Sequence, residues 1–188
     1  LEPLSEYNKT KMVSERVLKS YAGPMKIQIV RPATVCGLSP RMRLDVSVNM
    51  LTMQALTNGV IKVFGGTQVR PNIHIDDICD LYIFLLDSPE LEGIFNAGFE
   101  NISILKIARL VKERVECDIV ITGGNDPRSY RLDSSKLLKT GFKPKKTVSQ
   151  AIDEIISAFR KGELKDEPHF HNLNWMIKMI NDQKEMAQ

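Results

Sequence analysis

Long hydrophobic runs are missing from this sequence of 188 residues, since no apolar stretch approaches the roughly 20 residues that a membrane-spanning helix needs. A large excess of one charge sign is also missing: the formal net charge is +3, and the Lys and Arg residues are scattered along the chain. We therefore expect neither a membrane nor a nucleic acid as a partner. Cys36, Cys79 and Cys117 lie far apart and in no metal-binding spacing. They are expected to be reduced, mostly buried thiols of a cytoplasmic protein.

Near the start of the chain, Tyr7 and Lys11 form a Tyr-x-x-x-Lys pair. Residues four apart lie on the same face of a helix, so a helix would bring the phenol and the ammonium side by side. A neighbouring ammonium favours the phenolate form of a tyrosine, and such a pair can exchange a proton near neutral pH. On an arbitrary helix this spacing is usually only an exposed, weakly stabilising pair. By itself, the pair is therefore a weak indication of catalysis.

Strands alternate with helices along the chain, which indicates an α/β fold with some parallel sheet. Asp45 is expected to cap a helix, and Pro71 restricts its strand to a sheet edge or to a strand beginning. Residues 31–37 are expected to form a loop after the first strand. Helices are expected over residues 7–20, 45–58, 77–86, 103–111, 133–141, 149–160 and from about 172, and strands over 25–30, 60–64, 69–75, 93–98 and 118–122.

Three further motifs follow the Tyr-x-x-x-Lys pair. They are Arg-Pro-Ala-Thr-Val-Cys-Gly at residues 31–37, Val-Phe-Gly-Gly with a following Arg-x-x-Ile-His-Ile-x-Asp over residues 63–77, and Phe-Asn-Ala-Gly at residues 95–98. In this order, the four motifs resemble those of the extended short-chain dehydrogenase/reductases, the family of NAD-dependent nucleotide-sugar epimerases and dehydratases. The similarity covers about residues 3–160. Each motif is weak alone, and Cys36 departs from the pattern because a tyrosine is usual there.

The resemblance also indicates what this sequence lacks. It contains no Gly-x-x-Gly-x-x-Gly turn, the element that receives a dinucleotide pyrophosphate at a helix N-terminus. The family carries this turn in a first half, together with the acidic residue for the adenosine ribose and a catalytic Ser or Thr. The chain is therefore expected to be the C-terminal part of a longer protein. Alone, it should bind cofactor poorly and should not turn over.

The implied fold is the C-terminal part of a Rossmann-type doubly wound parallel sheet plus a smaller α/β substrate-binding domain. Residues 1–40 would end the dinucleotide-binding Rossmann domain with the catalytic helix and the strand after it. Residues 41–162 would form mainly the substrate-binding part, with a strand and a helix near 69–88 returning to the Rossmann domain. Residues 163–188 would form a C-terminal tail.

The resemblance implies the roles of the first two motifs. Tyr7, as phenolate, would take the proton of a sugar hydroxyl, while a nicotinamide takes the hydride. Lys11 would assist the phenolate and hydrogen-bond the nicotinamide ribose. The expected cofactor is NAD, with NADP left open because the residue that decides lies in the missing half. Four residues of the second motif would approach the nicotinamide and the sugar with backbone groups: Pro32, Ala33, Thr34 and Val35.

The expected substrate is a nucleotide-diphosphate sugar. Arg70 is the best candidate ligand for its phosphates, since a planar guanidinium binds phosphate oxygens bidentately and a lysine cannot. Arg128 resembles the family's second phosphate arginine, with Arg131 as a competing candidate. Asn49 could hydrogen-bond the diphosphate or the sugar, although polar residues on helices are commonly only solvated.

Val63 and Phe64 would offer backbone groups and an apolar face to the nucleotide base, and Phe64 could equally belong to the core. His74 is expected to be structural, since it precedes a helix in the family's third motif. Asp76 and Asp77 are expected to be N-cap and dipole partners of that helix.

These inferences predict an NAD(P)-dependent epimerase, dehydratase or 4-reductase of a nucleotide-diphosphate hexose. A homodimer is also expected, because family members commonly dimerise through a four-helix bundle that includes the Tyr-x-x-x-Lys helix, which here has apolar residues to spare. The alternative is a non-catalytic protein of the same fold that senses nucleotides or binds partners; the Tyr7–Lys11 pair argues against it. A free-standing α/β module with an unrelated role is a third hypothesis.

Overall fold

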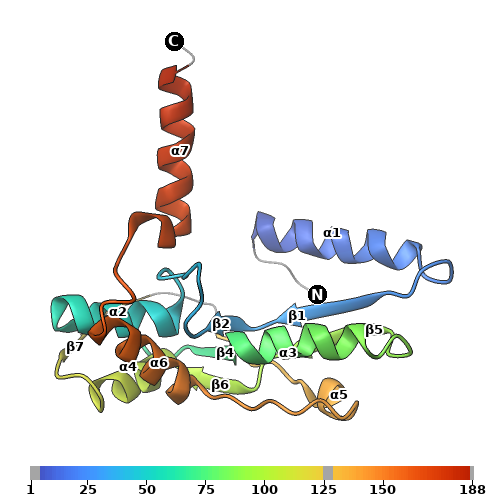
Figure 1. Cartoon of the computed structure of the whole chain (residues 1–188), viewed down its shortest axis with the longest axis horizontal. Coiled ribbons are helices and arrows are strands. Elements are labelled where there is room, and N and C mark those ends of the chain that lie inside the picture. Colours follow the sequence, from blue (N-terminus) through green and yellow to red (C-terminus); the bar gives the residue numbers. More distant parts are fainter. Residues whose placement is uncertain (1–4, 125–128, 187–188) are drawn as a thin grey trace.

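The computed structural model describes residues 5–124 and 129–186, and in these ranges helices and strands alternate (Figure 1). The helices described are α1 (Glu6–Ser20), α2 (Ser47–Asn58), α3 (Ile75–Leu86), α4 (Ile104–Lys112), α5 (Ser135–Leu138), α6 (Val148–Arg160) and α7 (Asn172–Met186), with a 3₁₀ turn η1 at Pro168–Phe170. The strands are β1 (Gln28–Pro32), β2 (Thr34–Cys36), β3 (Val60–Phe64), β4 (Val69–His74), β5 (Gly93–Ala97), β6 (Glu100–Ser103) and β7 (Asp118–Thr122).

The described strands form three small sheets, in which parallel pairing dominates. β1 pairs in parallel with β5, and β3 pairs in parallel with β7. In the third sheet β4 lies between β2, which is parallel to it, and β6, which is antiparallel. Parallel strands need crossover connections, and helices supply them here, as in α/β proteins generally. The predicted α/β class with parallel sheet is confirmed.

Two hydrophobic clusters organise these elements. The first, which we call the α3 cluster, lies between α3 and the strands β1 and β5, and its buried members are Ile73, Ile78, Leu81, Leu85, Phe95, Ala97, Leu137 and Phe142. The second, the α2 cluster, joins α2, α4 and α6 to β3, and includes Val48, Leu51, Ile61, Val63, Ile107, Val111, Ile152 and Ile156. The division predicted between residues 1–40 with 69–88 and the rest of 41–162 stays a prediction. The α3 cluster also takes Phe95, Ala97, Leu137 and Phe142 from outside the first two ranges.

In a third, smaller hydrophobic cluster, the segment after residue 162 packs against the loop before α2 and against α6. Phe170 packs with Met42 and Leu44, and its carbonyl accepts a hydrogen bond from the Leu44 N–H at 3.0 Å. From Asn172 the chain continues as α7, which stands away from the body (Figure 1). The predicted start of this helix is confirmed. No helix in the described ranges is long and apolar enough to cross a membrane.

Two stretches are more extended than the sequence indicates. Residues 31–37 were predicted to form a loop, but β1 runs through Pro32 and β2 covers Thr34–Cys36. The prediction was wrong because β5 offers a partner as far as Ala97, and β4 then offers one to β2. The strand β6 was not predicted, since its four half-buried residues show no alternation and are held by pairing with β4.

Two local predictions are corrected by the structure. Pro71 does not lie on an edge strand, since β4 is the central strand of its sheet. The proline is accommodated because the ladder with β2 begins only at Asn72, so β6 alone lies beside Pro71. Asp45 is not the N-cap of α2: Val46 holds that position, and Asp45 accepts a hydrogen bond from Arg43 instead, at 2.6 Å.

Gly37, directly after β2, is a position at which both the backbone conformation and the surrounding atoms exclude a side chain. Its φ is +110°, and a Cβ there would lie 2.9 Å from Nε2 of the buried His74 ring. Gly141 has a similar φ of +97°, but a Cβ there would meet nothing within 4 Å. A comparison of alanine substitutions at these two glycines therefore separates the cost of backbone strain from the cost of a steric clash.

We predict that Gly141→Ala lowers the free energy of unfolding by about 1 kcal/mol through strain alone. Gly37→Ala should cost at least roughly 1 kcal/mol more, because the imidazole cannot move without losing its own hydrogen bonds. Urea denaturation of both variants measures the difference. Equal losses would show that the His74 ring yields to a methyl group.

Candidate active site

The predicted catalytic pair lies on α1. Ser5 caps the helix, its side chain accepting a hydrogen bond from the Asn8 N–H at 3.2 Å. Within the helix the Tyr7 side chain is 68% exposed, and the Lys11 ammonium lies 5.4 Å from the centre of its ring. The phenol and the ammonium therefore share one helix face in a cation–π arrangement, and both remain accessible to a ligand.

A bidentate ion pair connects α1 to β1. Arg31 Nε donates to Glu15 Oε1 at 2.7 Å, and Nη2 donates to the second carboxylate oxygen. The hydrogen bond from Arg31 is the main reason that the pKa of Glu15 lies below its ordinary value, and the same bond raises the pKa of Arg31. Because α1 buries no residue, this pair is a principal tie between the helix and the sheet.

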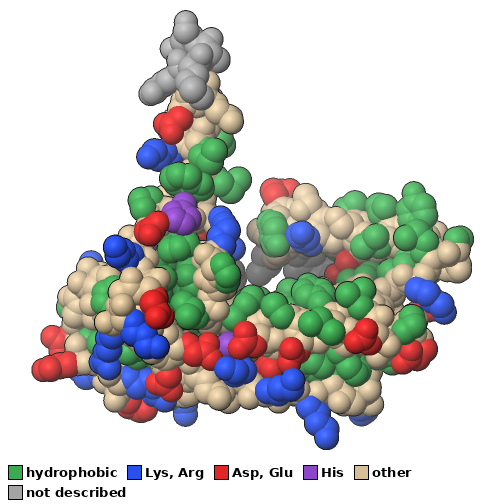
Figure 2. All heavy atoms as spheres, viewed as in Figure 1, with side chains coloured by type: hydrophobic (Ala, Val, Ile, Leu, Met, Phe, Trp, Pro, Cys, Tyr) green, Lys and Arg blue, Asp and Glu red, His purple; other side chains and the backbone are tan. Residues whose placement is uncertain are grey.

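The apolar side chains of α1 face solvent. Val13, Val17 and Leu18 are all about half exposed, as is Tyr21 after the helix. Figure 2 shows hydrophobic side chains at the surface of this helix, and Figure 1 shows its N-terminal end, which carries Tyr7, turned toward the middle of the molecule. The helix thus has an apolar face that no described part of the chain covers.

The residues predicted to approach a nicotinamide lie where β1 ends. β1 and β5 are parallel and end together at Pro32 and Ala97, and Ala33 continues the contact by donating its N–H to the Ala97 carbonyl at 2.7 Å. Pro32 is exposed, while Ala33, Thr34 and Val35 are half-buried. The carboxyl ends of parallel strands are where α/β sheets bind ligands.

Gly98 closes the same sheet edge from the other side. A Cβ on this residue would lie 2.6 Å from the Ala33 Cβ, which accounts for the glycine of the Phe-Asn-Ala-Gly motif. Its N–H donates to Ser134 Oγ at 3.0 Å, and its carbonyl accepts from that hydroxyl at 2.9 Å. The buried Ser134 was not singled out from the sequence, where it reads as part of a short helix start.

Arg70, the leading candidate phosphate ligand, is half-buried on β4. Its guanidinium lies 5.8 Å from the centre of the Tyr130 ring, and Nη1 donates to the Val69 carbonyl at 3.2 Å. Arg131 is exposed in the same segment as Tyr130. Arg128, the predicted second phosphate ligand, lies outside the described residues.

The remaining predicted substrate residues differ in exposure. Phe64 at the end of β3 is 60% exposed, so the interpretation of Phe64 as a core residue is wrong. Val63 is fully buried in the α2 cluster, which leaves only its backbone for a ligand. Asn49 is buried: its Oδ1 accepts from the Gly37 N–H at 3.1 Å and its Nδ2 donates to the Arg43 carbonyl at 3.1 Å. In this structure Asn49 therefore organises the loop before α2.

The thiol that replaces the family's usual tyrosine is buried at the end of β2. Burial raises the pKa of Cys36 to about 12, and nearby carboxylates add to the effect. Its Sγ lies 3.5 Å from the Ile73 carbonyl. Cys36 therefore stays a protonated structural thiol. The expectation of buried, unpaired thiols holds for Cys36 and Cys117, whereas Cys79 is exposed.

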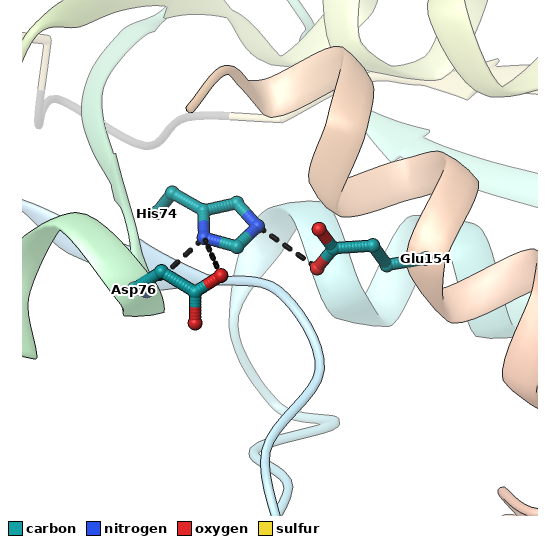
Figure 3. A group of neighbouring side chains, drawn as sticks. All are labelled: His74, Asp76 and Glu154. Carbon is teal, nitrogen blue, oxygen red and sulfur yellow. Dashed lines mark hydrogen bonds and ion pairs between the residues drawn. The ribbon is translucent and has the colours of Figure 1, made fainter. Parts of the chain in front are cut away.

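His74 begins α3. Its Nδ1 accepts from the Asp76 N–H at 3.1 Å, so this residue is the N-cap of the helix, and the expected N-cap role of Asp76 and Asp77 is corrected. The two aspartates lie in the first turn, where a carboxylate interacts favourably with the helix dipole. On its other side, His74 Nε2 lies 3.0 Å from Glu154 Oε2 (Figure 3). Glu154, from α6, was not predicted as a partner.

His74, Asp76 and Glu154 have the composition of a metal site, since their ligand atoms lie within 4.8 Å of one another. A lysine already supplies the positive charge there. The Lys146 ammonium lies 2.7 Å from Glu154 Oε1 and 3.5 Å from Asp76 Oδ2. Lys146 thus offsets part of the negative charge of the two carboxylates, and these side chains form a hydrogen-bonded network with His74.

Comparison with known proteins identifies the class of protein to which this fold and site belong. The model of the NAD dependent epimerase/dehydratase family matches residues 1–98, which is more than half of the chain. The chain belongs to this family, so the resemblance drawn from the four motifs is confirmed.

Curated relatives match over most of the chain. A dihydroflavonol 4-reductase of Hordeum vulgare is 25% identical over 158 residues, which is 82% of this chain and 45% of the relative. A protein of Bacillus subtilis named uncharacterized UDP-glucose epimerase YtcB is 34% identical over 118 residues, 60% of this chain and 37% of the relative. The chain spans about half the length or less of these relatives.

Solved structures share the fold. UDP-glucuronic acid 4-epimerase from Bacillus cereus, in complex with UDP-glucuronic acid and NAD, has a TM-score of 0.73 and 26% identity, with 85% of this chain and 54% of that chain covered. UDP-glucose 4-epimerase from Thermotoga maritima, with UDP-glucose, has a TM-score of 0.74 and 23% identity, with 86% and 55% covered. The predicted fold, part of a Rossmann-type sheet with further α/β structure, is confirmed.

The ion pair between α1 and β1 predicts that stability depends on pH. A carboxyl whose pKa is lowered by folding stabilises the fold above its unfolded pKa, and this contribution disappears as the pH falls through the folded value. Glu15→Gln should therefore lower the free energy of unfolding by about 1 kcal/mol at pH 7, since both side chains are mostly shielded from solvent. The difference from the unchanged protein should shrink as the pH falls below about 4.5.

Urea denaturation as a function of pH measures this difference. Glu6→Gln is the matched control on the same helix, because the Glu6–Lys9 pair is exposed and should contribute less than about 0.5 kcal/mol. A Glu15→Gln effect that stays constant between pH 7 and pH 3 would exclude the ion pair as its cause.

Proposed function

We propose that the whole protein is an NAD(P)-dependent enzyme that epimerises, dehydrates or reduces a nucleotide-diphosphate hexose, and that this chain supplies its proton-transfer pair and much of its substrate site. The observation that carries the proposal is the exposed Tyr7 phenol with the Lys11 ammonium over its ring, in the first motif of the family. A tyrosine used only for packing would bury its ring, whereas this one is open to a ligand.

Tyr7 is the general base. Its phenolate accepts the proton of the sugar hydroxyl that becomes a carbonyl, and the phenol returns a proton in the reverse direction. Lys11 holds its ammonium on the same face of α1 as the Tyr7 ring, where it would hydrogen-bond the nicotinamide ribose. The Glu15–Arg31 pair ties this helix to β1.

NAD is the proposed cofactor, with NADP left open. The residues described fit its nicotinamide end: the Tyr7–Lys11 pair is exposed, and the half-buried strand end at Ala33–Val35 lies at the carboxyl edge of the β1–β5 pair. The sequence has no glycine-rich turn for the pyrophosphate, so the remainder of the cofactor would be held by other parts of the protein. When bound, the nicotinamide supplies hydride transfer.

The substrate proposed is a nucleotide-diphosphate sugar, in line with the UDP-sugars bound in solved relatives. Arg70 binds the diphosphate: Tyr130 beside it orients the guanidinium plane, which favours bidentate contact with phosphate oxygens. Arg128 would add a second contact. Phe64 offers its exposed ring to the base, and Val63 offers backbone groups. Asn49 shapes the loop at Gly37 through its hydrogen bond to the Gly37 N–H. We also propose that Asn49 hydrogen-bonds the sugar or the diphosphate directly.

A homodimer is proposed for the whole protein. The exposed apolar side chains of α1, Val13, Val17 and Leu18, support it, since this is the helix through which family members commonly pair.

A second candidate function follows from the curated relatives that cover most of the chain. Dihydroflavonol 4-reductase and anthocyanidin reductase, at 25% and 26% identity over 82% and 87% of this chain, are named for substrates other than nucleotide sugars. An NAD(P)-dependent reductase of such a substrate would use Tyr7 and Lys11 in the same way, but it would not need Arg70 for a diphosphate. The arginine therefore distinguishes the two candidates.

We predict that Tyr7→Phe in the whole protein lowers the turnover number by roughly 10²- to 10⁴-fold while nucleotide-sugar binding is retained, because only the proton acceptor is removed. Tyr21→Phe is the matched control, since Tyr21 is exposed just beyond the same helix and should leave turnover unchanged. Steady-state kinetics and calorimetric titration give the two quantities. Full activity of Tyr7→Phe would rule out the proposed role of this phenol, whereas an unchanged protein that binds a nucleotide sugar and does not turn it over would favour a non-catalytic nucleotide sensor.

Arg70→Lys should raise the KM for a nucleotide-diphosphate sugar by about tenfold, because a lysine keeps the charge and loses the bidentate geometry. Arg109→Lys, at an exposed position on α4, is the control and should change nothing. An unchanged KM in Arg70→Lys would show that Arg70 does not bind the diphosphate, and a protein that turns over no nucleotide sugar would point to the reductase of another substrate.

A further inference from the structure

A network of charged side chains outside the candidate active site joins β4, α3 and α6. Its members are His74 at the end of β4, Glu154 on α6 and Lys146 just before α6, and we call these three residues the His74 clasp. Figure 3 shows the imidazole between Glu154 on one side and Asp76 on the other. The His74 side chain is fully buried, while the Glu154 and Lys146 side chains are about one-third exposed.

The hydrogen bonds of the clasp determine where its protons lie. The Asp76 N–H donates to Nδ1, so Nδ1 carries a lone pair, and in the neutral ring the proton is then on Nε2. Nε2 donates this proton to one oxygen of Glu154 at 3.0 Å, and Lys146 donates to the other oxygen at 2.7 Å. Both carboxylate oxygens are therefore held by defined donors, which restricts the rotation of the side chain.

The clasp crosses the boundary between the two main hydrophobic clusters. Ile73, the residue before His74, belongs to the α3 cluster, while Ile152 and Ile156, on either side of Glu154 along α6, belong to the α2 cluster. The contact joins residues 80 positions apart in the sequence. The clasp therefore ties together the two parts of the fold that carry different halves of the proposed active site.

A second contact between α3 and the start of α6 lies next to the clasp. The Asp77 carboxylate is buried on α3 and accepts the backbone N–H groups of Lys145 at 2.8 Å and Lys146 at 3.1 Å. These bonds fix the backbone from which the Lys146 side chain reaches Glu154. The start of α6 is thus held to the start of α3 by backbone and side chain together.

The clasp also controls the loop before α2. The backbone at Gly37 passes so close to the imidazole that a Cβ would lie 2.9 Å from Nε2. The Gly37 N–H is in turn bonded to Asn49, which also holds the Arg43 carbonyl. A displacement of the His74 ring would therefore be transmitted through Gly37 to Asn49 and to the loop between them.

We propose that the His74 clasp is a positioning device, which holds the loop over residues 37–45, and Asn49 with it, at a fixed place relative to the sheet that carries the Tyr7–Lys11 helix. His74 does not touch substrate; it acts through Gly37 and Asn49. The catalytic consequence of the clasp rests on the proposed function, whereas its effect on the loop does not.

Amide hydrogen exchange of the whole protein tests the positioning directly. His74→Asn keeps an N-cap acceptor for Asp76 but cannot reach Glu154, and Glu154→Ala removes the acceptor. Each variant should speed exchange over residues 37–45 by about tenfold, the double variant should add nothing further, and β1 should keep its protection. Asp153→Ala is the matched control: Asp153 is the neighbouring residue on α6, its bond to Arg114 lies away from the clasp, and the loop should not respond.

Exchange over residues 37–45 that stays within twofold of the unchanged protein, or that rises equally in Asp153→Ala, would overturn the proposal. Steady-state kinetics with UDP-glucose and NAD as probes supply the second measurement. Both clasp variants should raise the KM for UDP-glucose by about tenfold and leave that for NAD unchanged. Faster exchange with an unchanged KM for UDP-glucose would show that the clasp orders the loop but does not affect substrate binding. Faster exchange in a protein that turns over no nucleotide sugar would refute the proposed function and leave the effect of the clasp on the loop intact.

Discussion

The structure depends on one constraint: a buried imidazole must be satisfied on both of its nitrogens. His74 meets the helix α3 with one nitrogen and the helix α6 with the other, and the chain at Gly37 passes over its edge. An unpaired polar group at such a site would cost roughly 1–3 kcal/mol, so the three elements are held to one arrangement. The His74–Glu154 contact thereby links the elements that carry the α3 and α2 clusters.

The helix that carries the proposed proton-transfer pair, α1, is attached in a different way. α1 buries no side chain, and the bidentate pair between Glu15 and Arg31 ties it to β1. A charged contact of this kind defines direction as well as distance, because two parallel hydrogen bonds fix the guanidinium plane against the carboxylate. The phenol of Tyr7 is thus oriented by electrostatics, while the substrate side of the proposed site is oriented by packed helices and strands. The two sides of the proposed active site therefore depend on different physical interactions.

Much of the fold could be predicted from local sequence signals. The glycine after α2 adopts the left-handed conformation expected of a helix stop, Ser103 caps α4 as expected, and the strands β3, β5 and β7 lie where alternation or β-branched residues place them. What could not be predicted depends on partners distant in the sequence. β6 exists because β4 pairs with it, and Pro71 is tolerated in a central strand because its neighbour β2 begins one residue later.

The candidate site likewise contains residues whose arrangement follows from local sequence and residues whose role depends on distant partners. The Tyr7–Lys11 pairing follows from helical spacing alone, and the structure places the two side chains accordingly. The role of Glu154 has no local signal, because its partner His74 lies 80 residues earlier and a glutamate on an amphipathic helix is ordinarily solvated. The exposure of Phe64 was equally open from the sequence, since a strand end can face the core or a ligand. Tertiary structure decides both.

The thiol of Cys36 has a practical consequence. The thiolate is the reactive form of cysteine, and at this buried position burial suppresses it by raising the pKa to about 12. Cys79, by contrast, is exposed. Alkylating reagents would therefore modify Cys79 in the native state and Cys36 only when β2 separates from β4, so that the two cysteines form a built-in probe of how often this part of the sheet opens.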